Sequence, residues 1–254
     1  MGGALIAGWR NTQTYDASDF IVRDPAPGRE ALFARDEGAR LNPPLRSLSE
    51  ARVVVLATKP QAWRSAVSKI APFLDPDAMV ISIIAGVETA DIAEVMGGRP
   101  VARVMPNTAA AIGAGAASVF STDSDLYDLA HLLFEPLGTV VDVAEESLMH
   151  AVTALSGSGP AYLYALVEAL EAAGVEAGLD VSASARLSRA TIIGAAALLA
   201  QGEDSAGDLR RQVTSPGGTT EAALEVLTGP GGLPDLLTRA VCAAVERSAK
   251  LAAS

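Results

Sequence analysis

The sequence has few of the side chains that bind metal ions or form covalent cross-links. Its 254 residues include one cysteine, Cys242, and two histidines, His131 and His150. A single cysteine cannot form a disulfide within the chain, and so small a set of soft ligands argues against a metal site. We therefore expect no bound metal and a reducing, cytoplasmic compartment.

The sequence is also short of positive charge and of long apolar runs. It has 19 basic and 30 acidic residues, which give a formal net charge of −11 and a pI near 4.6. A nucleic acid or an anionic membrane would require a concentrated basic face, and no segment supplies one. No window reaches the roughly 20 apolar residues of a membrane span, and the first residues lack the pattern of a secretion signal. We expect neither a nucleic acid nor a membrane as partner.

What the sequence does have is enough apolar residues, half of the total, to bury one large core or two ordinary ones. In the first half these residues form short runs separated by helix-like segments, which is the rhythm of βαβ units. We predict a Rossmann-like, doubly wound parallel sheet in a dinucleotide-binding domain over residues 1–144. The predicted strands lie at residues 20–22, 53–57, 79–84 and 101–105, with further short pieces at 117–120 and 139–143.

The pattern changes at Glu145. From there the sequence is rich in Ala, Leu, Glu and Arg at helical spacing, interrupted by glycine-rich and proline-rich turns. We predict an all-helical second domain over residues 145–254.

Small or polar residues follow three of the predicted strands, at Leu56–Gln61, Ser82–Val87 and Met105–Thr108. Parallel strands end at one edge of the sheet, where such folds bind ligands, so the three segments indicate one crevice. Ile84, Ala85 and Gly86 could form the flat apolar wall that a nicotinamide ring needs. Ordinary strand-to-helix turns and tight packing explain these segments equally well.

Two turns in the helical half also favour a functional role. Ser156–Tyr162 places two glycines, two serines and a proline between helices, more than a plain corner needs. Val213–Glu221 contains Ser215 and Thr219 as candidate caps, and its two glycines expose main-chain N–H groups at the start of a helix. Such a turn suits a small anion such as a carboxylate, although a purely structural helix start is the alternative.

The candidates for acid–base chemistry are few. The hydroxyl of Thr220 and the carboxylate of Glu146 are the best of them, since Cys242 and His131 lie in helix-like sequence without a partner motif. Neither Thr220 nor Glu146 has an adjacent base that would make it a strong nucleophile. A reaction whose difficult step belongs to a bound cofactor fits better.

Together, these segments resemble pyrroline-5-carboxylate reductases over nearly the whole chain. Residues 57–61 resemble the family's A-V-K-P-Q turn, and residues 105–108 resemble its M-P-N-T-P. Residues 151–162 resemble A-V-T-x-L-S-G-S-G-P-A-Y, and residues 213–220 resemble V-T-S-P-G-G-T-T. The last two motifs are long, and all four occur in the family's order and spacing.

The resemblance implies a two-domain reductase with NADPH or NADH on the first domain. The helical second domain would form an intertwined dimer, as part of a larger ring such as a decamer. The implied substrate residues are Glu146, Ser215, Gly218, Thr219 and Thr220, with Thr220 catalytic. The implied cofactor residues are Met1, Gly2, Arg23, Asp24, Ala57, Thr58, Lys59, Pro60, Ile83, Ile84, Ala85, Asn107 and Gln212.

The implied reaction is reduction of 1-pyrroline-5-carboxylate to proline. The substrate carboxylate would rest on N–H groups at Gly218 to Thr220, which places its C=N bond against C4 of the nicotinamide. Hydride would reach the imine carbon, and the Thr220 hydroxyl would donate a hydrogen bond to the imine nitrogen directly or through water.

The sequence departs from the family pattern at its start. Family members open with a strand followed by G-x-G-N-M-G-x-A-L, of which Met1–Leu5 keeps the tail. The absent piece, about ten residues, would include a central strand and the glycines that admit the diphosphate. Either the natural chain starts further upstream, which we favour, or neighbouring segments or a partner fill the gap. Smaller departures are Thr58 in place of valine and Ala109 in place of proline.

Some alternatives stay open. Asp24 suits a free ribose hydroxyl, whereas Arg23 and Arg29 could bind a 2′-phosphate. A related hydroxyacid-dehydrogenase-like reductase would use a lysine in the helical domain, where Lys250 is the only one. A catalytically silent subunit is a third possibility, motivated by the shortened phosphate loop.

Overall fold

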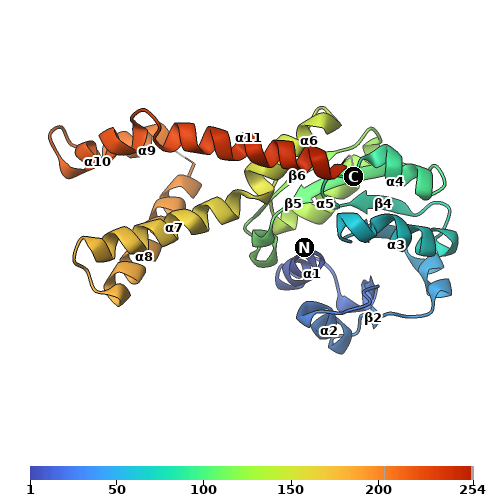
Figure 1. Cartoon of the computed structure of the whole chain (residues 1–254). Coiled ribbons are helices and arrows are strands. Elements are labelled where there is room, and N and C mark those ends of the chain that lie inside the picture. The colour runs from blue at the N-terminus through green and yellow to red at the C-terminus, as the bar shows by residue number, and fades with distance from the viewer. Residues whose placement is uncertain (203, 253–254) are drawn as a thin grey trace. The chain divides into compact units, whose positions relative to one another are not determined.

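The computed structural model describes residues 1–202 and 204–252, which fall into two compact units. The first unit comprises Met1–Ser158 together with Ala243–Ser254, and the second comprises Gly159–Cys242. The division between units therefore falls after Ser158 rather than at residue 144, and the end of the chain returns to the first unit. Figure 1 shows the elements of both units along the chain.

The first unit contains a five-stranded sheet whose strands lie in chain order. Strands β3, β4 and β5 are parallel, as the Rossmann-like pattern predicts. Strand β6 is antiparallel to β5, and β7 is parallel to β6, so the two strands that extend the parallel part run in the opposite direction to it. The reason is the short link between β5 and β6, since parallel neighbours need a crossover of a dozen residues or more. The bounds are β3 (Val53–Leu56), β4 (Met79–Ser82), β5 (Val101–Pro106), β6 (Gly115–Phe120) and β7 (Gly138–Asp142).

A separate two-stranded parallel sheet lies in the same unit. It pairs β1 (Ile21–Val22) with β2 (Arg40–Leu41), and α2 (Arg29–Asp36) connects them. Within the described residues neither strand is hydrogen-bonded to β3. In the dinucleotide-binding strand order the first strand lies between the second and the fourth, so the sheet is divided where sequence analysis expected a central strand.

Alternating side chains of the large sheet enter two different cores. Along β4 and the two residues that follow it, Ile81 and Ile83 belong to one buried cluster, whereas Val80 and Ile84 belong to the other. Helices α1 and α5 cover the first face, and α3 and α4 cover the second. A sheet covered on both faces is the doubly wound arrangement that the apolar runs predict. The bounds are α1 (Gly2–Asn11), α3 (Trp63–Ile70), α4 (Thr89–Val95) and α5 (Ser124–Phe134).

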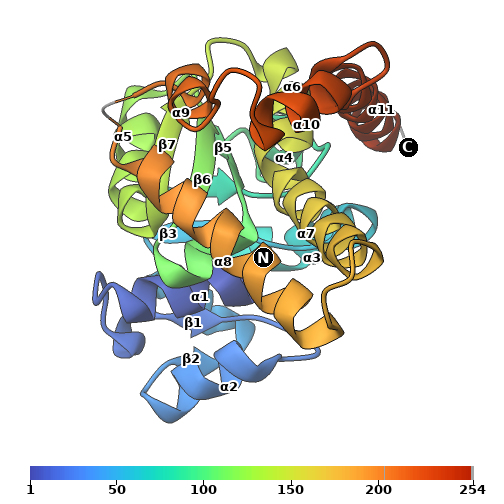
Figure 2. The same cartoon turned by 90° about the vertical axis from the view of Figure 1, so that its left-hand side faces the viewer.

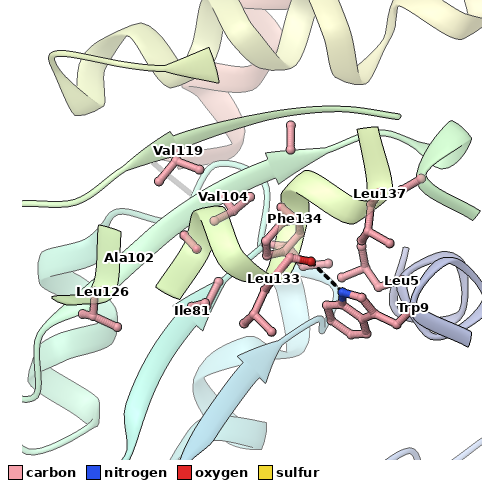
Figure 3. Packing of buried hydrophobic residues seen from close by; sticks show 14 residues of the cluster. Leu5, Trp9, Ile81, Ala102, Val104, Val119, Leu126, Leu133, Phe134 and Leu137 are labelled. Carbon is pink, nitrogen blue, oxygen red and sulfur yellow. Dashed lines mark hydrogen bonds between the residues drawn. The ribbon is translucent and has the colours of Figure 1, made fainter. Parts of the chain in front are cut away.

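Helix α1 packs closely on the first core. The indole N–H of Trp9 donates a hydrogen bond to the carbonyl of Leu133 at 2.7 Å, which joins α1 to the end of α5 (Figure 3). Gly8 has no side chain to hold the helix away: a Cβ there would lie 2.3 Å from the carbonyl oxygen of Ala110 and 2.7 Å from Leu137 Cδ2. This glycine is therefore required by close packing.

The second unit is entirely helical in its described part, as predicted for this half of the chain. Helices α7 and α8 cross closely at Gly174, where a Cβ would lie 2.2 Å from Ser184 Oγ. The Ser184 hydroxyl donates to the carbonyl of Glu171 at 2.7 Å. The bounds are α7 (Gly159–Glu176), α8 (Val181–Ala200), α9 (Ala206–Gln212), α10 (Thr219–Thr228) and α11 (Leu233–Ala252), of which Figure 2 gives a second view.

Two further observations concern the helices of both units. Helix α11 begins in the second unit and ends in the first, because the division falls after Cys242. None of the described helices has the length and hydropathy needed to cross a bilayer.

Candidate active site

The candidate cofactor site lies at the edge of the first unit where β3, β4 and β5 end. Parallel strands place their carboxyl ends together, so the segments after residues 56, 82 and 106 share this edge. Helix α1 starts beside it: a Cβ on Gly2 would lie 3.3 Å from Cβ of Ala57. The first N–H groups of a helix have no partner within the helix and attract anions. The start of α1 at Gly2 and the turn after β3 at Ala57 are therefore neighbours.

The turn after β3 presents Ala57, Thr58, Lys59 and Pro60. Ala57 and Lys59 are exposed, and Thr58 and Pro60 are half-buried. Pro60 begins a short 3₁₀ helix, Pro60–Ala62. The hydroxyl oxygen of Thr58 is buried and has no hydrogen-bond partner among the described residues. A buried hydroxyl without a partner is uncommon and calls for an explanation.

The segment after β4 differs from the expected nicotinamide wall. The side chains of Ile83 and Ile84 are buried in the two opposite cores, so only their main chain could face a ligand. Gly86 has φ +76°, and a Cβ there would lie 3.3 Å from the amide nitrogen of Ala252, in the last turn of α11. Close packing thus requires Gly86, which was one of the two open explanations. Ala85 remains half-buried beside it.

Asp24 and Arg23 follow β1 and are held by the loop after β2. Asn42 accepts a hydrogen bond from the Asp24 main-chain N–H at 3.0 Å and donates to the Asp24 carbonyl at 2.7 Å. The Asp24 carboxylate accepts from the N–H of Ala26 at 2.8 Å, and Arg23 donates to the carbonyl of Pro43 at 2.6 Å. Both side chains are thereby fixed at the end of β1, where a ribose is bound in this fold.

Glu146 is surrounded by protein donors at the start of α4. Its Oε1 accepts from the N–H of Thr89 at 2.8 Å and from Arg103 at 3.0 Å, and its Oε2 accepts from the Thr89 hydroxyl at 2.7 Å. The Arg103 side chain is only 4% exposed, so the ion pair is largely buried. Glu146 therefore caps α4 and neutralises Arg103, and only Oε2 keeps an acceptor position for anything else.

Arg103 and Thr89 were missed by sequence analysis. The signal for Arg103 was present, because a charged residue inside the apolar run 101–105 must be paired when it is buried. No local pattern indicates which carboxylate pairs with it.

Asn107, predicted to contact the cofactor, bonds to three main-chain groups of the protein. Its Oδ1 accepts from the N–H groups of Ala109 and Ala116 at 3.1 and 3.3 Å, and its Nδ2 donates to the carbonyl of Ser156 at 3.2 Å. Gly157 follows Ser156, and a Cβ there would lie 3.0 Å from Cε of Met105. The first part of the Ser156–Tyr162 motif thus packs against the end of β5, in a turn of π-helix (Thr153–Gly157) that continues α6 (Met149–Val152).

The predicted anion-binding bend lies in the second unit. Gly218 is the N-cap of α10, and no side chain caps that helix in the part of the chain described, so the prediction of Ser215 and Thr219 as caps is wrong. The carbonyl of Ser215 accepts from the N–H of Gly218 at 3.0 Å, and Glu221 accepts from the N–H of Gly217 at 2.7 Å.

The groups left for an anion at this bend are those of the first helical turn. The N–H of Gly218 is already bonded, whereas Thr219 and Thr220 are the first two residues of α10. N–H groups at these positions have no acceptor within the helix. Ser215 and Thr219 are exposed and Thr220 is half-buried, so all three side chains belong to one open bend. Gln212 lies at the end of α9, where its amide donates to Asp204 at 2.7 Å.

A further titratable cluster lies on the surface of the first unit, around His131. His131 contacts Glu135 at 2.9 Å and Asp142 at 2.7 Å. The hydrogen bonds to Glu135 and then Asp142 raise the pKa of His131. A hydrogen bond to Asp142 is the largest cause that raises the pKa of Tyr127 to about 12. Among the residues that can be described, no cluster of three or more His, Cys, Asp or Glu side chains is arranged to hold a metal.

Similarity to known proteins extends over almost the whole chain. A pyrroline-5-carboxylate reductase from Pseudomonas aeruginosa is 36% identical over 257 residues, covering 99% of this chain and 93% of that protein. A pyrroline-5-carboxylate reductase from Pisum sativum is 34% identical, covering 99% of this chain and 92% of that one. The chain belongs to the pyrroline-5-carboxylate reductase family. The expectation drawn from the four motifs is confirmed.

Solved structures of the pyrroline-5-carboxylate reductase family also match this fold. The reductase from Coxiella burnetii has a TM-score of 0.88 at 33% identity and covers 98% of this chain and 93% of that one. The pyrroline carboxylate reductase from Plasmodium falciparum, solved with NADP bound, has a TM-score of 0.85 at 27% identity, with 99% and 94% covered. The Rossmann-like fold and helical second domain are therefore those of the family.

Two family models match separate parts of the chain. Residues 146–251 match the model for pyrroline-5-carboxylate reductase dimerisation, and residues 1–86 match the model for coenzyme F420-dependent NADP oxidoreductases. This member of the reductase family therefore has a dinucleotide-binding part and a self-associating part. The predicted domain boundary at residue 144 lies just before the dimerisation match, although the compact units divide after Ser158.

Proposed function

We propose that this chain reduces 1-pyrroline-5-carboxylate to L-proline with NAD(P)H, the last step of proline biosynthesis. Its membership of the reductase family and its match to an NADP oxidoreductase model support an NAD(P)H-dependent enzyme. The structural observation that carries the proposal is the open bend before α10, with the N–H groups of Thr219 and Thr220 at a helix start. The comparisons do not favour a hydroxyacid-dehydrogenase-like enzyme or a silent subunit.

The residues of the first unit fit a dinucleotide. The buried, unpartnered hydroxyl of Thr58 lies one residue beyond Ala57, which lies beside the start of α1, and Asp24 is fixed at the end of β1. NAD(P)H supplies the hydride of the reaction when bound. In the proposal Met1, Gly2 and residues 57–60 hold the diphosphate and ribose. The main chain of residues 83–85 would support the nicotinamide end, and Gln212 of the second unit would reach the cofactor.

We assign the substrate to the bend before α10. The carboxylate would accept hydrogen bonds from the N–H groups of Thr219 and Thr220, with Ser215 and Gly218 shaping the bend. The sequence also predicted the N–H of Gly218 as a donor to the carboxylate, but that N–H is already bonded to the carbonyl of Ser215. Glu146 keeps one free acceptor position for the substrate, although most of its capacity serves Thr89 and Arg103.

Thr220 is the proposed catalytic residue. Its hydroxyl would donate a hydrogen bond to the imine nitrogen, directly or through water, so that the adjacent carbon accepts hydride. A threonine hydroxyl suits this role because it donates one hydrogen bond without carrying a charge.

The test is Thr220→Ala, which should lower turnover at least about tenfold, the lower range of effects of lost acid–base groups. Steady-state turnover with 1-pyrroline-5-carboxylate and fluorescence titration of NADPH measure the two quantities separately. Cofactor affinity should not change, because Thr220 lies in the bend rather than among the cofactor residues. Thr228→Ala, at the other end of α10, is the control. Equal turnover in wild type and T220A would refute the role.

The finer points of assembly and location are also proposals. Self-association follows from the dimerisation match, and we propose that dimers assemble further into a ring such as a decamer. We propose the cytoplasm as compartment, and NADPH as the preferred donor with NADH as the alternative.

A further inference from the structure

The turn after β3 contains a polar group that the protein itself does not use. The hydroxyl oxygen of Thr58 is buried, yet it has no hydrogen-bond partner within the described chain, whereas the residue as a whole is half-buried. Leaving a buried hydroxyl unpaired costs free energy. The side chain of this threonine is therefore poorly satisfied in the cofactor-free protein.

The main chain next to Thr58 does not provide a hydrogen-bond partner for its hydroxyl. A threonine hydroxyl commonly bonds the N–H two residues later, but here that residue is Pro60, which has no N–H. The carbonyl of Lys59 accepts the N–H of Ala62 at 3.0 Å, as part of the 3₁₀ helix that follows. The hydroxyl thus lacks the partner that would hold it in a turn of this kind.

The surroundings indicate what the hydroxyl could bind. Ala57, the preceding residue, lies beside Gly2 in the first turn of α1, where the N–H groups attract an anion. An anion placed there would lie one residue along the chain from Thr58, within the same turn after β3. Rotation about the Cα–Cβ bond, between its staggered positions, moves the hydroxyl from the buried to the exposed side of a half-buried residue.

We propose that the Thr58 hydroxyl turns toward bound NAD(P)H and donates a hydrogen bond to an oxygen of its ribose–diphosphate portion. This inference rests on the proposed function, which includes binding of NAD(P)H. It adds one side-chain contact to the proposed cofactor site. The family pattern has valine at this position, so the contact distinguishes this chain from that pattern. Threonine and valine have nearly the same shape, so replacing one with the other tests the hydroxyl alone.

The proposal predicts opposite effects of Thr58→Val on stability and on binding. Without cofactor, T58V should unfold at a higher temperature than wild type, because an unpaired buried hydroxyl is replaced by a methyl group. With cofactor, T58V should bind both NADH and NADPH about tenfold more weakly, because one hydrogen bond to a charged or polar acceptor is lost. Calorimetric unfolding and fluorescence titration measure these two effects.

Two further variants serve as controls. Thr58→Ser keeps the hydroxyl and should restore most of the affinity. Thr139→Val makes the same change at an exposed position of β7, and it should alter neither the unfolding temperature nor the affinity.

Several outcomes would overturn the proposal. They are equal affinity of T58V and wild type, a T58V protein less stable without cofactor, failure of T58S to recover affinity, or a loss confined to NADPH. Absence of NAD(P)H binding by the wild type would overturn it as well. A wild type that binds NAD(P)H but does not turn over 1-pyrroline-5-carboxylate would refute the proposed reaction while leaving this contact standing.

Discussion

The two units of the chain bury their apolar residues to very different degrees. The first unit has two cores, one on each face of its sheet, with residues such as Ile81 and Ile92 completely buried. In the described part of the second unit only Ser184 is buried, whereas Val226 is 77%, Val181 is 73% and Ile193 is 69% exposed. A helical layer that exposes apolar side chains over several helices marks an interaction surface. The first unit completes its own core, and the second needs another chain to complete one.

The glycines show the same contrast. Gly8 in α1 and Gly194 in α8 are both inside helices, where glycine is normally a disadvantage. A Cβ on Gly8 would collide with the main chain of Ala110, whereas a Cβ on Gly194 would meet nothing within 4 Å. One glycine is explained by contacts within the unit, and the other is not.

The largest effect that we predict tests the closed core of the first unit. Gly8→Ala should lower the free energy of unfolding by about 3 kcal/mol, because the carbonyl oxygen of Ala110 cannot move away from a Cβ 2.3 Å distant without shifting the main chain. Chemical denaturation measures the change. A loss below about 1 kcal/mol, the smaller end of such effects, would mean that α1 is held less closely than the structure shows.

Gly194→Ala is the matched comparison for Gly8→Ala. In a helix open at that point it should raise stability by about 0.5–1 kcal/mol. Destabilisation of the assembled protein by this variant would instead show that a second chain packs directly on Gly194.

The next effect tests the open surface of the second unit. Ile193→Asp should weaken self-association at least about a hundredfold, since a charge buried in an apolar interface loses its hydration without gaining a partner. Sedimentation velocity over a range of concentrations measures the change. Ile112→Asp, at a side chain 77% exposed in the first unit, should leave association unchanged. Equal effects of the two substitutions would contradict the division of roles between the units.

The smallest effect concerns the surface of the first unit. Interaction with Glu135 and Asp142 raises the pKa of His131, and hydrogen bonds from Tyr127 and then His131 lower the pKa of Asp142. The stability contributed by His131 is full below its unfolded-state pKa of about 6.5 and is lost as pH rises through the raised native value. The contribution of Asp142 is lost as pH falls through its lowered native pKa.

His131→Gln should therefore destabilise the protein most between the two titrations, near pH 6, and less at pH 9. We expect less than about 1 kcal/mol, because the cluster is at the surface. Denaturation curves of wild type and H131Q at the two pH values provide the test. A difference independent of pH would show that the charge of His131 does not contribute.

Much of the architecture could be predicted from the sequence because apolar periodicity determines where strands and helices lie. The runs at 53–57, 79–84 and 101–105 each contain a strand of the large sheet, and the second half is helical as expected. Strand direction was not predictable from periodicity, since an apolar run is the same in a parallel and an antiparallel strand. The reversal at β6 depends on the short link from β5.

The candidate site was predictable in position more than in role. The segments after β3 and β4 and the bend before α10 lie at strand ends and at a helix start, as their residues indicated. The partners of Glu146 and Asn107 are far away in sequence, Thr89 and Arg103 for the first and Ser156 for the second, and no local pattern identifies such pairs. Main-chain hydrogen bonds determine which N–H groups are left for a ligand. The N–H of Gly218, for example, already donates to the carbonyl of Ser215.

Among the described residues, β1 and β3 share no ladder hydrogen bonds, so the segment from Phe20 to Asn42 is not part of the five-stranded sheet. Its two strands bond to each other, and it is joined to the large sheet through side-chain packing rather than through a shared ladder. Exchanging this segment would leave every ladder hydrogen bond of the five-stranded sheet in place. Arg23 and Asp24, which the sequence predicts to contact the ribose of the cofactor, lie on this segment. We therefore expect that transplanting it from a relative would change nucleotide preference without altering the five-stranded sheet.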